Sequence, residues 1–302
     1  EDLRMLAVEG FVLPEEGLQR INVVLRQMHD IFTFFTHTRQ KNYPTLYQIL
    51  RDITFDASLI AAIEKVIDEE GNIRPDASPE LQKIRRMIGS KERELDKVFR
   101  SVINEYRKQG WLTDNVESFR NGRRVLAVPA EHKRKIRGII HDESATGKTA
   151  FIEPEIIINL NNDLFDLEQE ERRELYRILR DLSAEIRPYS FNLSAYETII
   201  VRFDVIQAKA NLAIQMKATK PKLKNVPHIG IIDAYHPLLL LKNKAEGKKT
   251  IPLDLVFKHN NRILVLSGPN AGGKSISMKS IGLIQLMTQA GLLTPLDKES
   301  EV

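Results

Sequence analysis

The residue pattern with the clearest chemical meaning lies in eight consecutive residues near the end of the sequence. They match the phosphate-binding loop pattern of a glycine, four residues and then Gly-Lys-Ser. The residues are Gly268, Pro269, Asn270, Ala271, Gly272, Gly273, Lys274 and Ser275. Glycines let such a loop point its N–H groups at phosphate oxygens, and the next helix adds the positive end of its dipole. We therefore predict a nucleotide site, with Lys274 on the β- and γ-phosphates and the Ser275 hydroxyl on Mg²⁺.

The residues around this loop supply the context that the chemistry requires. Residues 263–266 predict a buried strand leading in, and residues 276–290 predict an amphipathic helix leading out. A second Gly-Lys-Thr run, at residues 147–149, has Asp142 where the pattern needs a glycine, and no long helix follows it. We interpret that second run as a structural turn.

Hydrolysis of a nucleotide needs acidic residues in addition to the loop. A carboxylate after a second apolar strand should bind Mg²⁺, and another acidic group should orient the attacking water. No such strand follows Lys274 in the sequence, and the acid-ended run 229–233 precedes the loop and is interpreted as an ordinary sheet strand. The catalytic residues therefore remain unknown, and we predict a chain that binds a nucleotide without hydrolysing it.

A second candidate site is a cluster of basic residues with only Glu117 and Glu131 nearby to offset it. Its members are Arg120, Arg123, Arg124, Lys133, Arg134, Lys135 and Arg137. Such a cluster can bind the phosphate backbone of a nucleic acid by releasing counterions. It can equally be a solvated surface, and charge alone does not choose between the two.

Apolar periodicity predicts a mainly helical chain. Helices are expected at 14–36, 44–70, 79–110, 154–186 and 194–216. Ser78, Pro79 and Glu80 form a helix-start signal, because serine caps N–H groups, proline suits the first position and glutamate suits the dipole. Asn121-Gly122 predicts a hairpin, and short strands are expected at 138–140 and 149–152.

These elements suggest four parts. Residues 1–110 are expected to form a helical core and lever, and residues 111–153 a β-rich insert. Residues 154–216 are expected to form returning helices, and residues 217–302 the start of an α/β domain. Strands of that domain are expected at 229–241, 250–257 and 262–267. The predicted fold class is mainly α with a small β-rich insert, followed by the truncated start of an α/β phosphate-loop domain.

Composition narrows the class of protein. The 302 residues carry 45 Lys and Arg against 41 Asp and Glu, and no cysteine, which excludes disulfides and cysteine nucleophiles and fits a cytoplasmic location. No apolar run approaches the roughly 18–20 residues that cross a bilayer, so no membrane partner is expected. The first residues show neither a leader nor an initiator Met, and we interpret the chain as a piece of a longer one.

The loop carries a family resemblance. Gly-Pro-Asn before Gly-Gly-Lys is similar to the phosphate loop of MutS-type ATPases, and His236-Pro237 resembles that family's Arg-His-Pro turn, with Tyr235 in place of the arginine. A further set of residues resembles the MutS branch that lacks a mismatch-reading domain and usually ends in a small nuclease domain. The set comprises Ile67, Asp68, Gly71, Ile73, 76–81, 84–85, 138–147, Thr149, 151–154 and 160–162.

The resemblance implies ATP and Mg²⁺ as cofactors, lever helices, and a clamp formed by the β-rich insert around nucleic acid. It implies that the full-length protein is a homodimeric ATPase, with an endonuclease activity in a domain outside this chain. Its branch is associated with branched or recombining DNA and with restraining recombination. The alternatives are a ribosome-directed ATPase that separates collided ribosomes by gripping rRNA, and a structural dimerisation module with an idle basic cluster.

Overall fold

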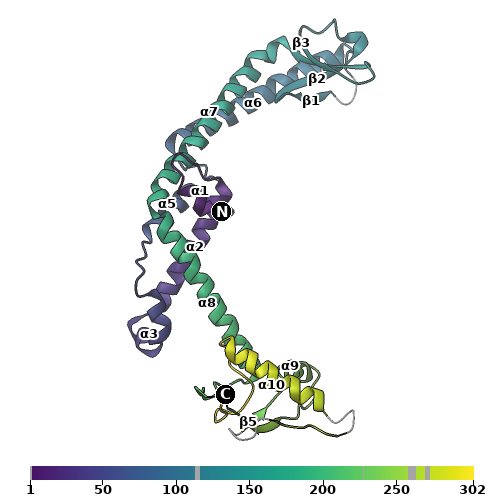
Figure 1. Ribbon diagram of the computed structural model, residues 1–302. Coiled ribbons are helices and arrows are strands. Elements are labelled where there is room, and N and C mark those ends of the chain that lie inside the picture. The colour runs from purple at the N-terminus through teal and green to yellow at the C-terminus, as the bar shows by residue number, and fades with distance from the viewer. Residues whose placement is uncertain (1, 113–115, 227, 258–262, 269–272) are drawn as a thin grey trace. The chain divides into compact units, whose positions relative to one another are not determined.

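The computed structural model describes residues 2–112, 116–226, 228–257, 263–268 and 273–302 (Figure 1). It divides into two compact units, Glu1–Glu197 and Thr198–Val302. The expected mainly helical chain with a small antiparallel sheet is confirmed. The division between the units falls inside a helix that the sequence assigned to one part, 154–216. Along the described residues, no helix has the length and apolar character needed to cross a bilayer.

The first unit begins with short and medium helices. They are α1 (Asp2–Leu6), α2 (Glu15–Phe34), α3 (His37–Asn42), α4 (Pro44–Tyr47), a 3-10 turn (Gln48–Leu50) and α5 (Ser58–Val66). The helix expected near 14–36 is confirmed by α2. The single helix expected over 44–70 is wrong, because residues 51–57 are not helical. Asp56 Oδ1 accepts the Ser58 N–H at 2.8 Å, and this local bond starts a new helix instead of continuing the old one.

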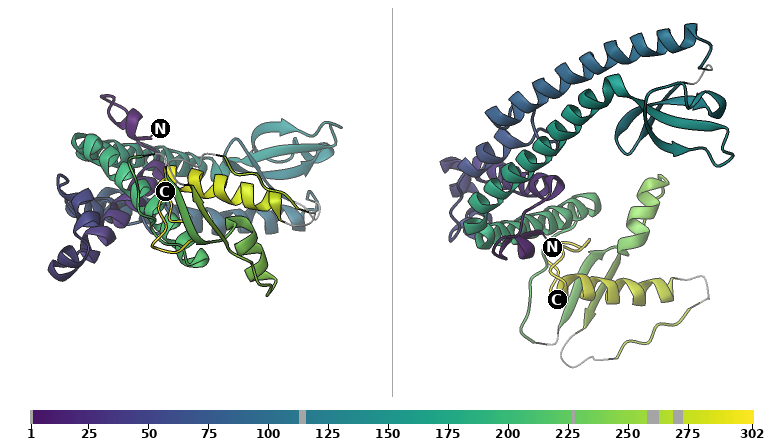
Figure 2. Two further views of the ribbon diagram at one scale, coloured as in Figure 1. Left: turned by 60° about the horizontal axis from the view of Figure 1, so that its bottom comes forward. Right: turned by 90° about the horizontal axis from the view of Figure 1, so that it is seen from above.

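Two long helices, α6 (Pro79–Lys108) and α7 (Glu155–Ile186), lie side by side (Figure 2). The predicted start of α6 is confirmed, since Ser78 Oγ accepts the Leu81 N–H at 3.0 Å. Ser78 also donates to Glu174 of α7 at 2.6 Å, and the Arg177 guanidinium beside Glu174 holds the pKa of that carboxyl below its usual range. Helical structure continues after α7 through a 3-10 turn (Arg187–Tyr189) into α8 (Ser190–Met216).

A four-stranded antiparallel sheet packs at one end of this helix pair (Figure 1). Its strands are β1 (Glu117–Arg120), β2 (Arg123–Pro129), β3 (Gly138–Glu143) and β4 (Thr149–Pro154), in the order β1-β2-β4-β3. Leu126 and Ile152 face each other across β2 and β4 and are fully buried against Phe99 of α6 and Ile157 of α7. This small core joins the sheet to both helices.

The turns of the sheet agree with their sequence signals. Asn121 and Gly122 connect β1 to β2 with φ values of 51° and 76°, the left-handed pair that a two-residue hairpin requires. Gly147 and Lys148 lie in the turn between β3 and β4, with Gly147 at φ 68°, and Thr149 begins β4, which agrees with the predicted structural turn. It is not a phosphate loop, because a strand follows it.

The second unit contains β5 (Ile229–Ala234) paired antiparallel with β6 (Leu253–Phe257), together with α9 (Pro237–Ala245) and α10 (Lys274–Gln289). The strand expected over 229–241 is confirmed at 229–234 and wrong from Pro237 onward, where α9 begins. Asp233 adopts φ 45° within the register shift between Ile231 and Ala234, the strand ends at Ala234, and Pro237 at the first helical position starts α9. The apolar run that follows Pro237 belongs to a helix.

The strand expected over 262–267 is not formed at its described residues, 263–267. Ile263 and Val265 are 87% and 82% exposed, where a buried strand was predicted. A strand of this apolar kind is stable when other strands and helices cover both of its faces. Among the described residues no strand pairs with it.

We predict that Gly138→Ala destabilises the first unit by about 3 kcal/mol, the upper range for forcing an extra methyl into a packed site. A Cβ at this position would lie 2.0 Å from the carbonyl oxygen of Glu153, so β3 would have to separate from β4. Urea unfolding of the variant chain measures the loss.

The matched control is Gly89→Ala in α6, where the nearest atom to a new Cβ is the flexible end of Arg93 at 3.6 Å. It should stabilise the helix by up to about 1 kcal/mol. Equal stability changes for the two variants would contradict the close approach of β3 and β4.

Candidate functional site

The described part of the phosphate loop consists of Gly268, Gly273, Lys274 and Ser275, and the other predicted residues (269–272) lie outside the described ranges. Gly268 and Gly273 have φ values of 145° and 82°, which side chains rarely tolerate. Glycine at both ends therefore permits the backbone path of the loop. The assignment of the loop to a nucleotide stays a prediction.

The helix expected after the loop is confirmed as α10, which begins at Lys274. Its N-cap is Gly273, and no side chain among the described residues accepts a hydrogen bond from the first turn. The Lys274 ammonium folds back onto the carbonyl oxygen of Gly268, and the Ser275 side chain is exposed. A helix start with uncapped N–H groups and a cation folded over the loop fits the phosphate groups of a nucleotide.

The structure separates the seven predicted basic residues into two groups. Four of them form ion pairs within the first unit. Arg120 pairs with Asp142, Arg123 with Glu153, Arg124 with Asp96 and Glu117, and Lys133 with Glu143. The interpretation that only Glu117 and Glu131 offset the cluster is therefore wrong, because acids of α6, β3 and β4 reach it in space.

Arg123 and Arg124 connect the sheet to the two long helices. Arg123 donates to Asn162 of α7 at 2.6 Å. Arg124 pairs with Asp96 of α6, and its guanidinium lies 4.5 Å from the Phe99 ring centroid. The Arg124 guanidinium holds the pKa of the Asp96 carboxyl below its usual range. Arg123 therefore contacts α7 and Arg124 contacts α6.

Glu153 is the centre of a buried polar network. Its side chain has no exposed surface, and its Oε1 accepts from Arg123 at 3.0 Å and from Asn161 at 2.7 Å. His141 Nε2 lies 2.6 Å from the other carboxylate oxygen. Asn161 also donates to the Arg124 carbonyl at 3.1 Å. The network joins β2, β3, β4 and α7, and the residues that the family resemblance drew from 138–154 and 160–162 meet here.

The second group comprises Arg134, Lys135 and Arg137, which are exposed and form no ion pair within the described part of the chain. Lys148 shares these properties and lies in the β3–β4 turn, where its carbonyl accepts the Ala130 N–H at 2.9 Å. Arg137 lies at the other end of β3, where its carbonyl accepts the Glu155 N–H at 3.0 Å. Sequence reasoning missed Lys148 because it treated the Gly-Lys-Thr run only as a rejected loop. We call these four residues the exposed basic group.

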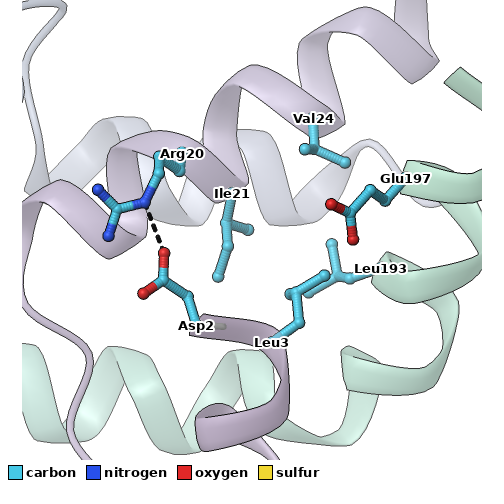
Figure 3. A pocket seen from close by; sticks show the side chains of 7 residues that line it. All are labelled: Asp2, Leu3, Arg20, Ile21, Val24, Leu193 and Glu197. Atoms are coloured by element: carbon cyan, nitrogen blue, oxygen red, sulfur yellow. Dashed lines mark hydrogen bonds and ion pairs between the residues drawn. The ribbon is translucent and has the colours of Figure 1, made fainter. Parts of the chain in front are cut away.

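A cavity of about 470 Å³ also opens in the first unit (Figure 3). It is bordered by α1, α2 and the start of α8, and Arg20 pairs with Asp2 across its edge at 2.5 Å. That guanidinium holds the pKa of Asp2 below its usual range. None of the predicted site residues lies in this cavity.

Comparisons with known proteins identify relatives along nearly the whole chain, although no family model matches it. Proteins named Endonuclease MutS2 share 33% identity over 295 residues in Finegoldia magna, 35% over 297 in Lacticaseibacillus casei and 34% over 287 in Enterococcus faecalis. These matches cover 97%, 97% and 94% of this chain and 36% of each relative. The chain belongs to the MutS2-type family, and it spans about a third of the length of these relatives.

We predict that Glu153→Gln destabilises the first unit by about 3 kcal/mol, because the amide cannot neutralise Arg123 and replaces one acceptor oxygen with a donor. Urea unfolding followed by circular dichroism measures the change. Glu143→Gln is the matched control on the neighbouring strand, since its pair with Lys133 is partly exposed and should contribute less than about 1 kcal/mol. Equal losses of unfolding free energy in the two variants would show that the buried network stabilises the unit no more than the exposed ion pair does.

Proposed function

We propose that this chain forms the nucleotide-binding and nucleic-acid-binding part of a MutS2-type ATPase. In this proposal, ATP at Gly268–Ser275 controls how the β1–β4 sheet holds nucleic acid. The observation that carries the proposal is the start of α10, where an uncapped first turn follows a glycine-ended loop and Lys274 folds over it. The relatives' family adds support, since the resemblance to MutS-type loops was drawn from these same residues.

Each part of the loop has a distinct role in this proposal. Backbone N–H groups of the loop and the first turn of α10 would hold phosphate oxygens, Lys274 would contact the β- and γ-phosphates, and Ser275 would hold Mg²⁺. Ser275 is the residue that would hold Mg²⁺, and the bound ion would supply positive charge to offset that of the phosphates. No residue of this chain is assigned to activate water, so we expect nucleotide binding without turnover by this chain alone.

The exposed basic group is the proposed contact with nucleic acid. Its four cations have no ion pair within the described residues, so phosphates would not have to displace an internal carboxylate. The proposed ligand is branched or recombining DNA, and the proposed outcome is restraint of recombination by a cytoplasmic homodimer. The relatives' name adds an endonuclease activity, which we propose for the intact protein.

A ribosome-directed role uses the same chemistry, because rRNA presents the same phosphate groups. Binding of the intact protein to four-way DNA junctions, compared with its co-sedimentation with collided ribosomes, distinguishes the two targets. A chain that binds neither target would be a structural dimerisation module.

We predict that Lys274→Ala weakens ATP binding by the intact protein at least about tenfold, which corresponds to about 1.4 kcal/mol. The physical reason is the loss of the ammonium group that folds over the loop. Isothermal titration calorimetry with Mg²⁺ present measures the affinity. Lys279→Ala, on the exposed surface of the same helix, should leave it unchanged. An unaltered affinity in Lys274→Ala would remove the nucleotide site.

A double change, Arg134→Gln with Lys148→Gln, should weaken binding to duplex DNA. It should also make the negative slope of log K against log salt shallower by about 2, because each lost phosphate contact releases one counterion fewer. Fluorescence anisotropy over a series of salt concentrations gives both quantities.

The matched control removes two exposed arginines of α7 that form no ion pair among the described residues, Arg172→Gln with Arg173→Gln. It should leave both quantities unchanged. The same slope in both double variants would mean that the exposed basic group is not the contact.

A further inference from the structure

An aromatic and basic cavity of about 460 Å³ lies where α6 ends and α7 begins. Its volume lies within the range of about 300–1,000 Å³ that is typical of small-ligand sites. The side chains that matter here are Tyr106 and Trp111, Lys135 and Arg137, and Glu105 and Glu155. They come from the end of α6, the residues after it, the segment before β3 and the first turn of α7. Neither the phosphate loop nor the buried network uses this cavity.

The end of α6 builds the aromatic wall. Gly110 adopts φ 71° and donates its N–H to the Arg107 carbonyl at 3.0 Å, while Trp111 donates to the Tyr106 carbonyl at 3.1 Å. This pair of bonds is the glycine-dependent helix ending in which the residue after the glycine packs back on the last turn. The Trp111 and Tyr106 rings consequently lie 5.6 Å apart at 34°. Both are partly exposed.

The polar groups of the cavity suit a nucleotide. Lys135 Nζ lies 5.9 Å from the Trp111 ring centroid, and neither Lys135 nor Arg137 forms an ion pair with any described residue. These two cations can receive a phosphate. Carboxylates accept hydrogen bonds from the amino groups of bases, a role open to Glu105 and Glu155.

The Tyr106 hydroxyl adds a donor. Burial, followed by the charges of Glu105 and Glu155, raises the pKa of Tyr106. The hydroxyl therefore stays protonated at neutral pH and can donate to a ligand oxygen or nitrogen. Donors, acceptors and an aromatic surface thus border one space.

We propose that this cavity binds one unpaired nucleotide of a nucleic acid, with its base on the Trp111 and Tyr106 rings and its phosphate on Lys135 and Arg137. The inference rests on the proposed nucleic-acid binding and adds a preference to it. A base inside a duplex is stacked on its neighbours and cannot enter a cavity, whereas an unpaired base presents a whole face. Loss of stacking on an aromatic side chain typically weakens binding of a base by roughly tenfold.

Trp111 reports on the cavity directly, because it is the only tryptophan among the 302 residues. Its fluorescence should be quenched by a short single-stranded oligonucleotide and by a duplex with one bulged nucleotide. A fully paired duplex of the same length should bind, by anisotropy, with much less quenching. A free nucleoside monophosphate serves as a further arm, and we expect it to quench only at much higher concentration.

Substitutions then test the preference. Trp111→Leu should reduce the preference for the bulged over the paired duplex about tenfold, and leave affinity for the paired duplex unchanged. Trp111→Phe keeps an aromatic ring on Tyr106 and should retain most of the preference, which separates loss of stacking from misfolding. Phe119→Leu is the matched control, because Phe119 is a 61% exposed aromatic on β1 outside the cavity. It should change nothing.

The outcomes separate this inference from the proposed function. Binding of all the nucleic acids with no quenching, and with the preference intact in Trp111→Leu, would overturn the inference and leave the proposed function standing. No binding of any nucleic acid would overturn both. Equal quenching by free nucleoside monophosphate and by the bulged duplex would overturn the assignment to a nucleic acid, since the cavity would then bind a small nucleotide.

Discussion

The buried carboxylate of Glu153 is the interaction on which the arrangement of the first unit depends. A charge without solvent exposure is tolerated only when other groups neutralise it and donate hydrogen bonds to it. Arg123 and Asn161 donate to it and His141 Nε2 lies 2.6 Å from its second oxygen, so its partners come from β2, α7 and β3. Satisfying one charge therefore ties three strands to one helix, and an element that moved away would leave that charge unpaired.

The basic residues near this network have two different roles. Arg123 and Arg124 are used to attach the sheet to α7 and α6, where their charges are matched by carboxylates. The cations with no internal partner among the described residues are the ones that can accept phosphate, and they lie before β3 and in the β3–β4 turn. The basic residues that form one cluster in the sequence therefore form two groups in the fold. One group holds the sheet on the helices, and the other is the candidate contact for nucleic acid.

The features predicted correctly from sequence are those that few neighbouring residues decide. Ser78 caps α6 and Asn121-Gly122 forms the hairpin because the groups involved lie within four residues of one another. The misassigned run after Pro237 has an apolar pattern that suits a strand or a helix, and Pro237 with the N-cap His236 favours the helix. For the candidate sites, the loop pattern was evident, whereas the acids that pair with the basic cluster were not.

The sequence by itself determined the glycine positions of the loop, the helix that starts at Lys274, the long helices and the small sheet. Each of these follows from backbone conformation or from apolar spacing, which are local properties. Only the tertiary structure decided which arginines are structural, that Lys148 joins the exposed basic group, and that Trp111 borders a cavity with Lys135 and Arg137. The physical reason is that ion pairs and cavities depend on the distances in the fold between residues that are far apart in the sequence.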